Sequence, residues 1–295
     1  IPGLALTLRT LPAGSSVVVQ PPVYGPFFHL PGGAGLECLR SPLGRTAEGR
    51  YYQDPERLEH DIQQNTSALM LCNPHNPVGR VFTREELESV AEVCLRHDLL
   101  ILSDDIHCEL IHAGYRHTPI ASLSPEVEAR CVTVMAPSKT FNMAGLHCAF
   151  AIIPNPDLRQ SIMKTGAWAM LGSNIMGYAA ALAAYRDSGP WLDALMVYLG
   201  ENRDLVTAAV RERMAGVTLE PSEGTYLAWL DCSGTRIEGS MGRFFHEHAK
   251  MVVGGGEGYG GDPHLIRLNY GCPRPMLEEG LRRMATALAC AEKVG

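Results

Sequence analysis

Three short strand-like runs, each leading into a loop that carries polar residues, constrain the fold of this chain more than any other feature. The runs are Ala68–Cys72, Leu99–Leu102 and Arg130–Met135. Aliphatic runs of this length are typical of strands buried on both faces in a parallel sheet. Between the first two runs lies an amphipathic pattern, 83–94, with an N-capping threonine and Glu86 at capping-box spacing. This alternation predicts an α/β fold with a mainly parallel sheet and helices on both faces.

The rest of the chain extends the same pattern. Ser15–Gln20 and Ala149–Ile153 read as two further strands, and a long helical stretch runs from about Met176 to Arg213. Two helix breakers meet at Ser188–Pro190, which indicates a domain boundary. We therefore expect a large domain over residues 1–188 and a smaller C-terminal α/β domain over residues 189–295.

The polar residues that end the three runs are an amide, a carboxylate and an amine. Asn76 lies in a turn with two Asn-Pro steps, Asp104 follows the second run, and Lys139 follows the third. In an open α/β sheet, ligands bind at the carboxyl ends of the strands. A lysine amine held there out of bulk water can condense with an aldehyde, and pyridoxal phosphate is a cofactor that proteins anchor in this way. Taken alone, Lys139 would more readily be interpreted as an ordinary surface lysine at a strand end.

Asp104 and His107 suit the same cofactor. Pyridoxal chemistry needs a carboxylate against the pyridine nitrogen, because a protonated ring is the better electron sink. Asp104 is the candidate for that role, and His107 is placed to hydrogen-bond near the phenolic oxygen of the cofactor. The alternative role for Asp104 is the N-cap of a following helix. Asparagine, aspartate and lysine at three strand ends, in that order, point to a pyridoxal phosphate site.

The segments around these residues resemble those of a known family. The matching segments are Asn73–Arg80, Ser103–Cys108, Ala136–Asn142, Val23–Phe28, Glu223–Asp231 and Arg267–Arg274. They resemble the fold-type I pyridoxal-phosphate enzymes of aminotransferase class I/II, and most of all the cystathionine β-lyase or C–S lyase branch, which includes the maltose-regulon modulator. The resemblance covers almost the whole chain. It implies an aminotransferase-like fold, pyridoxal 5′-phosphate as cofactor and a small amino acid as substrate.

The resemblance also implies a role for each matching residue of the cofactor site. Lys139 would be the catalytic lysine and the covalent anchor of the cofactor, with Ser138 beside it in the cofactor site. Asp104 would be the partner of the pyridine nitrogen. Asn76 would contact the phenolic oxygen, with His107 at the position where many aminotransferases have tyrosine.

Two more roles and an oligomeric state follow from the resemblance. Tyr24 would stack on the cofactor ring, which the geometry of an aromatic face permits. Arg267 would bind the α-carboxylate of the substrate through its bidentate guanidinium. Enzymes of this fold type generally complete each site from a partner chain, so the resemblance implies a homodimer.

Three departures from the family pattern bear on function. Aminotransferases of this class usually carry an arginine eight residues after the lysine, whereas this chain has His147. The lyase branch commonly lacks that arginine, so His147 favours elimination. Asp105 replaces the usual glutamate of the branch and leaves the proposed pyridine partner untouched. Family members also carry a segment ahead of Ile1 that helps to bind the cofactor phosphate, so we expect the chain to be incomplete at its N-terminus.

Composition narrows the class of protein. The chain has 295 residues, 46% hydrophobic content and a formal net charge of −7, which argues against nucleic acid or an anionic membrane as partner. No apolar stretch reaches the length of a spanning helix, and the start lacks the basic region of a signal peptide. Nine cysteines without a Cys-x-x-Cys pair suit the reduced thiols of a cytoplasm. We expect a cytoplasmic enzyme without a metal site.

The glycine-rich run Gly254–Gly261 resembles a phosphate cradle. No lysine follows it, and no strand-to-helix context fits a P-loop. We interpret it as a flexible loop close to the active site, with a plain linker as the equal alternative.

Three functions remain open at this stage. The first is a C–S β-lyase that releases a thiol, pyruvate and ammonia from cystathionine or a related cysteine S-conjugate. The second is an aminotransferase on the same scaffold, and the third is a lyase-like transcriptional modulator that binds another protein. His147 and the branch motifs favour the lyase. The intact pair Lys139 and Asp104 argues against a purely regulatory protein.

Overall fold

A six-stranded sheet forms the larger part of the molecule. The computed structural model describes residues 1–166, 172 and 174–292. The strands of this sheet are β1 Ser16–Val19, β2 Glu37–Arg40, β5 Thr66–Cys72, β6 Leu100–Asp104, β7 Cys131–Met135 and β8 Phe150–Ile152. Their order is β2-β1-β5-β6-β7-β8, and every neighbouring pair is parallel except β7 with β8. The predicted mainly parallel sheet is confirmed.

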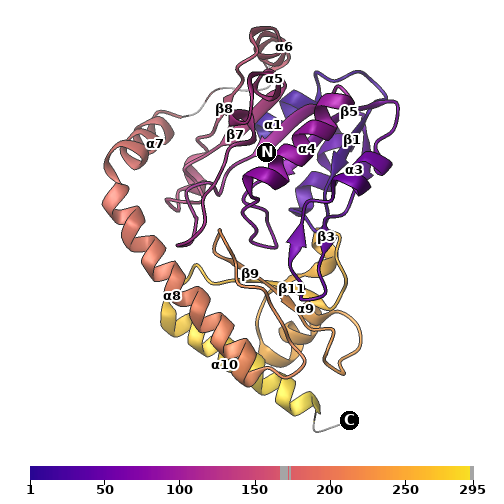
Figure 1. Ribbon diagram of the computed structural model, residues 1–295. Coiled ribbons are helices and arrows are strands. Elements are labelled where there is room, and N and C mark those ends of the chain that lie inside the picture. Colours follow the sequence, from indigo (N-terminus) through magenta and orange to yellow (C-terminus); the bar gives the residue numbers. More distant parts are fainter. Residues whose placement is uncertain (167–171, 173, 293–295) are drawn as a thin grey trace.

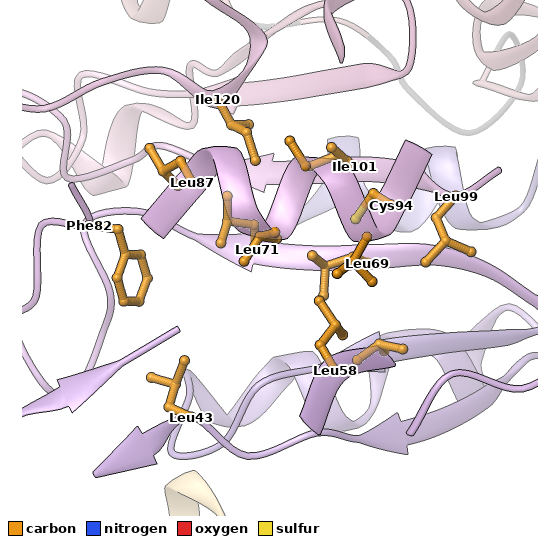
Figure 2. Close-up of a cluster of buried hydrophobic side chains, with 14 of the residues drawn as sticks. Leu43, Leu58, Leu69, Leu71, Phe82, Leu87, Cys94, Leu99, Ile101 and Ile120 are labelled. Atoms are coloured by element: carbon orange, nitrogen blue, oxygen red, sulfur yellow. The ribbon is translucent and has the colours of Figure 1, made fainter. Parts of the chain in front are cut away.

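Helices cover both faces of this sheet (Figure 1). One face carries α1 Pro2–Leu8, α2 Leu30–Gly33 and α6 Pro156–Gly166; the other carries α3 Pro55–Asp61, α4 Arg84–Arg96 and α5 Pro125–Glu128. Side chains alternate along β5, so Leu69 and Leu71 join the core beneath α4, whereas Ala68 and Met70 join the core beneath α1. Figure 2 shows Leu69 and Leu71 packed against Leu87 and Cys94 of α4.

The N-terminus of α4 is capped as the sequence predicts. The Thr83 hydroxyl accepts a hydrogen bond from the Glu86 N–H at 3.2 Å, and the Glu86 carboxylate accepts one from the Thr83 N–H at 2.8 Å. Both interactions satisfy N–H groups that have no partner within the helix. The cap fixes where α4 begins and where the loop after β5 must end.

A second, smaller sheet lies in the C-terminal part. Its strands are antiparallel, in the order β10-β11-β9. The elements of this C-terminal part are β9 Leu227–Asp231, α9 Met241–Phe244, the π-helical turn η4 Phe245–Ala249, β10 Gly254–Gly255, β11 Leu265–Asn269 and α10 Arg274–Glu292. A separate apolar core joins this sheet to α10 and to α8 Gly189–Arg213.

The predicted helical stretch 176–213 is two helices. They are α7 Ile175–Asp187 and α8, and they break at Ser188, ahead of Gly189 and Pro190. In Figure 1, α8 runs from α7 into the C-terminal half and lies along α10. We propose that this break is the boundary between residues 1–188 and 189–295, because most of the second core lies beyond it.

The remaining described elements are short. They are η1 Gly25–Phe28, β3 Gly44–Arg45, β4 Tyr51–Tyr52, η2 Ile120–Ser122, η3 Ala144–Leu146 and η5 Gly256–Tyr259. Among the helices of the described residues, none is both long enough and apolar enough to cross a membrane.

Candidate active site

The ends of β5, β6 and β7 meet at one edge of the large sheet. The parallel register pairs Cys72 with Asp104 and Asp104 with Val134, so the three strands end side by side. Asn76 follows β5, Asp104 is the last residue of β6, and Lys139 lies in the turn that follows β7. The sequence prediction that these three side chains lie on neighbouring strand ends is confirmed.

Asp104 is a desolvated carboxylate. Burial raises the pKa of Asp104 to about 6, an effect that the hydrogen bond from the Ile106 N–H and the charge of the Lys139 side chain partly oppose. Its Oδ1 accepts a hydrogen bond from the Ile106 N–H at 3.3 Å. The alternative role as a helix N-cap is wrong, because a turn follows Asp104 and the next helical segment begins only at Ile120. A cation beside this carboxylate would restore its charged form.

A cavity opens beside Asp104. Its volume is about 450 Å³, and its lining includes Asp104, Ile106, Ala136, His147, Phe150 and Tyr178. His147, the residue that departs from the aminotransferase pattern, is an exposed residue of this wall.

His107 is buried with an unsatisfied ring nitrogen. Burial, together with the positive charges of Lys139 and Arg267, lowers the pKa of His107 to about 3. The ring meets Tyr226 edge-on, with centroids 5.7 Å apart. Its Nδ1 is buried and has no hydrogen-bond partner among the described residues. A buried polar atom without a partner is costly, so this nitrogen fits a site completed by a bound polar group.

Arg267 reaches the same place from the second sheet. Its Nη1 donates a hydrogen bond to the Asn76 Oδ1 at 3.0 Å, and its Cζ lies 4.8 Å from the centroid of the Tyr259 ring. Its Nε is buried and unpaired within the described part of the chain. The Nε side of the guanidinium is thus available to an anion, and a carboxylate matches that planar pair of donors.

Lys139 is an exposed residue of this structure. The reason is local: Lys139 lies in a turn beyond the sheet, where the strands no longer cover it. The next residue is anchored, because the buried Thr140 hydroxyl donates to Glu109 Oε2 at 2.7 Å. Ser138 is half-buried and its carbonyl accepts from the Met143 N–H at 3.1 Å.

Tyr24 follows the end of β1 and is half-buried. Its ring meets Phe27 edge-on, with centroids 6.3 Å apart. The position beside the other strand ends fits the predicted site, and the stacking role of Tyr24 stays a prediction.

Sequence reasoning missed three residues that the fold brings to the site. Tyr226 packs on His107, Tyr259 covers Arg267, and Glu109 holds Thr140. Tyr226 belongs to a segment that resembles the family, and Tyr259 lies within the glycine-rich run, which were the only signals available. The interpretation of that run as a plain linker is wrong, because it forms β10 and η5 beside Arg267.

Comparison with known proteins gives a consistent result. The family model described as "Aminotransferase class I and II" matches residues 1–284. Cystathionine beta-lyase PatB of Bacillus subtilis (strain 168) is 38% identical over 283 residues, which cover 94% of this chain and 72% of that protein. Cystathionine beta-lyase of Corynebacterium glutamicum is 33% identical over 291 residues, with coverages of 97% and 74%.

A solved structure shows the same architecture. Cystalysin from Treponema denticola, whose crystal structure contains pyridoxal 5′-phosphate, superposes with a TM-score of 0.94 at 31% sequence identity. The match covers 98% of this chain and 75% of that chain.

Proposed function

The chain belongs to the aminotransferase class I and II family, and we propose that within it the protein is a pyridoxal-phosphate-dependent carbon–sulfur β-lyase. Its reaction would release a thiol, pyruvate and ammonia from cystathionine or a related cysteine S-conjugate. The relatives named cystathionine beta-lyase support the reaction, and the cofactor in cystalysin supports pyridoxal phosphate.

One observation carries the proposal. Three buried polar groups of this edge of the sheet lack what a cofactor with an amino acid would supply, and the charge of Lys139 acts on two of them, Asp104 and His107. The three groups are the desolvated carboxylate of Asp104, the unpaired Nδ1 of His107 and the unpaired Nε of Arg267. A pyridinium nitrogen, a phenolic oxygen and an α-carboxylate are the complementary groups.

The residues that would hold the cofactor follow from these positions. Lys139 would bind its aldehyde, with Ser138 beside it, and Asp104 would face its ring nitrogen. When bound, the cofactor supplies an electron-withdrawing ring that makes the α-proton of an amino acid acidic. Asn76 uses its Oδ1 on Arg267, so its amide N–H groups are available to the phenolic oxygen. His107 would lie near the same oxygen.

Tyr24, placed beyond the end of β1, would stack on the face of the cofactor ring.

The remaining chemistry belongs to Arg267 and Lys139. The free side of the Arg267 guanidinium would bind the substrate's α-carboxylate and so fix the direction of the Cα–H bond. Once the amine of the substrate has replaced it at the aldehyde, the free Lys139 amine would take the α-proton. The electron pair of the broken Cα–H bond forms the Cα–Cβ double bond, and the pair of the Cβ–S bond leaves with sulfur as a thiolate. The released enamine takes up water and yields pyruvate and ammonia.

His147 supports elimination over amino transfer. It occupies the position where the aminotransferase pattern has an arginine that binds the cofactor phosphate, and it lies in the wall of the cavity beside Asp104. Aminotransferases usually have an arginine at this position and the lyase branch commonly lacks it, so His147 favours the lyase branch.

We further propose that the protein is a homodimer that pairs through one apolar face. That face is made by β8 and α7, with Phe150, Ile152, Ile175, Met176, Tyr178 and Leu182, all between 42% and 78% exposed. The two elements adjoin, since Phe150 of β8 meets Tyr185 of α7 at a centroid distance of 5.9 Å, and exposed apolar side chains gathered in this way are typical of a protein interface. Phe150 and Tyr178 also line the cavity beside Asp104, so a second copy would close that cavity.

A cytoplasmic location is part of the same proposal. All nine cysteines of the chain are free thiols, as they would be in a reducing compartment.

Product analysis tests the proposed reaction. Purified protein supplied with pyridoxal phosphate and L-cystathionine should form pyruvate and ammonia in equal amounts without any added keto acid. Turnover that requires a keto acid as amino acceptor, and that leaves the carbon–sulfur bond intact, would show an aminotransferase instead.

A further inference from the structure

Among the described residues, the guanidinium of Arg267 has one hydrogen-bond partner, Asn76, and lies over one aromatic ring, that of Tyr259. Its Nη1 is fixed by Asn76, but its Nε has no partner among the described residues. The Tyr259 ring lies over the group, with its centroid 4.8 Å from Cζ. Contact between a guanidinium and an aromatic face is attractive and restricts the plane of the cation.

Tyr259 is itself fixed from two sides. Its carbonyl accepts a hydrogen bond from the Val23 N–H at 3.0 Å, next to Tyr24. The edge of Trp229 meets the ring at a centroid distance of 5.6 Å and an angle of 84°. Tyr259 as a whole is 9% exposed, so its ring has little room to rotate away from Arg267.

Gly254 in the glycine-rich run allows the Tyr259 ring to lie close to the backbone of β10. Gly254 pairs with Arg267 between β10 and β11. A Cβ on Gly254 would lie 2.5 Å from the Tyr259 hydroxyl oxygen and 3.0 Å from its Cε2. A Cβ on Gly256 would lie 2.1 Å from the Asp262 carbonyl oxygen. Gly254 therefore leaves the space that the Tyr259 ring occupies, whereas Gly256 lets the backbone of the same segment approach Asp262 closely.

We propose that Tyr259, seated on the Gly254–Gly261 segment, is a positioning residue that orients Arg267 toward the α-carboxylate of the substrate. Gly254 contributes to the same positioning, because a residue without a side chain leaves the space that the Tyr259 ring occupies. The inference rests on the proposed function, in which Arg267 binds that carboxylate.

A pair of ligands isolates the contribution of the carboxylate. L-alanine and ethylamine differ by the α-carboxylate, and neither has a leaving group. Isothermal titration calorimetry of the protein loaded with pyridoxal phosphate gives the ratio of their affinities. Tyr259→Leu should lower that ratio by about five- to thirtyfold, the range expected when a partly to fully desolvated cation–π contact is lost. Tyr259→Phe keeps the ring and should retain most of the ratio.

Two further variants and a control sharpen the test. Gly254→Ala should lower the ratio with Tyr259 in place, and Gly254→Ala combined with Tyr259→Phe should recover part of it, because the closest clashing atom is gone. If Tyr259→Leu does not fold, the comparison of Gly254→Ala with Gly254→Ala/Tyr259→Phe still tests the positioning role. Tyr115→Leu makes the same change at a 46% exposed tyrosine and should leave the ratio unchanged.

The outcomes separate the inference from the proposed function. An unchanged ratio in Tyr259→Leu, or an equal loss in Tyr259→Phe, overturns the positioning role even if cystathionine is cleaved. A lowered ratio in a protein that does not cleave cystathionine upholds the positioning role and contradicts the lyase. In an active lyase, Tyr259→Leu should raise KM far more than it lowers kcat, whereas a general structural defect would lower kcat as well.

Discussion

Burial drives two titratable residues of the site, Asp104 and His107, toward their neutral forms. It raises the pKa of Asp104 to about 6 and lowers the pKa of His107 to about 3. The neutral imidazole can remain buried at neutral pH, but the carboxylate is then ionised at a cost in folding free energy. A cation bound against Asp104 would remove that cost. The residue is therefore unfavourable for the empty protein and favourable for a protein that holds a protonated ring.

Asp104→Asn should stabilise the cofactor-free protein and weaken cofactor binding. The pKa of the Asp104 carboxyl is about 6 in the folded protein and 3.8 as its ordinary value, so the folded protein binds this proton more tightly than the unfolded chain does. The free energy of unfolding of the wild type therefore falls as pH rises from about 4 to about 6. The variant lacks this loss. The difference in unfolding free energy between the two proteins should grow over that range to the order of 1–3 kcal/mol at pH 7. Denaturant unfolding across pH measures it.

The exposed carboxylate of Asp193 provides the control for this prediction. Asp193→Asn should change stability little at any pH in the same range. A difference for Asp104→Asn that shrinks as pH rises from 4 to 6 would contradict the assignment.

Arg267→Ala should impair substrate binding more than the chemical step. Loss of a bidentate charged contact costs about 2–4 kcal/mol in kcat/KM, and most of it should appear in KM. Arg267→Lys keeps the charge without the planar pair of donors and should recover only part. Steady-state kinetics with L-cystathionine measures both, and exposed Arg236→Ala is the matched control. Equal KM values for wild type and Arg267→Ala would rule out the carboxylate role.

At the scale of single elements, the sequence predicts what local chemistry determines. The cap at Thr83 and the strands that end at Asp104 and Met135 are as predicted, because caps and apolar runs act within a few residues. The antiparallel direction of β8 was not predictable, since it depends on where the chain returns to the sheet. Likewise, Arg267 and Tyr259 meet only because β10 and β11 pair.

Thr83→Ala should lower the free energy of unfolding, because it removes the N-cap of α4, which packs on the large sheet. The change removes the hydroxyl that accepts from the Glu86 N–H, and loss of such a cap costs about 1 kcal/mol. Denaturant unfolding measures the loss. Thr286→Ala makes the same substitution inside α10, where alanine is the better helix former, and should cost nothing or stabilise slightly. Equal losses in the two variants would contradict the capping role.

At the scale of the whole molecule, the candidate site lies where the two sheets meet. Asn76 from the end of β5 accepts from Arg267 of β11. Nearby, the buried Arg80 donates to Glu223 at 2.8 Å and so joins the β5 loop to the segment before β9. The groups assigned to the cofactor come from one part and the carboxylate contact from the other. The relative placement of the two parts therefore determines whether substrate and cofactor can meet.

Leu182→Glu should dissociate the proposed homodimer. A charge at this 58% exposed position of α7 would be buried unpaired on association, while the folded monomer would tolerate it. Sedimentation or light scattering should show a monomer with reduced lyase activity. Met276→Glu changes a 66% exposed methionine of α10 in the same way and should remain dimeric. A wild-type protein that is monomeric and fully active would rule out the dimer proposal.

The most direct test of the account is where the cofactor attaches. The chain has four lysines, at positions 139, 164, 250 and 293. Borohydride reduction of the protein with pyridoxal phosphate, followed by peptide mass mapping, should place the reduced cofactor on Lys139, and Lys139→Ala should abolish both the labelling and pyruvate formation. Labelling of any other lysine, or labelling that persists in Lys139→Ala, would contradict the site built from β5, β6 and β7.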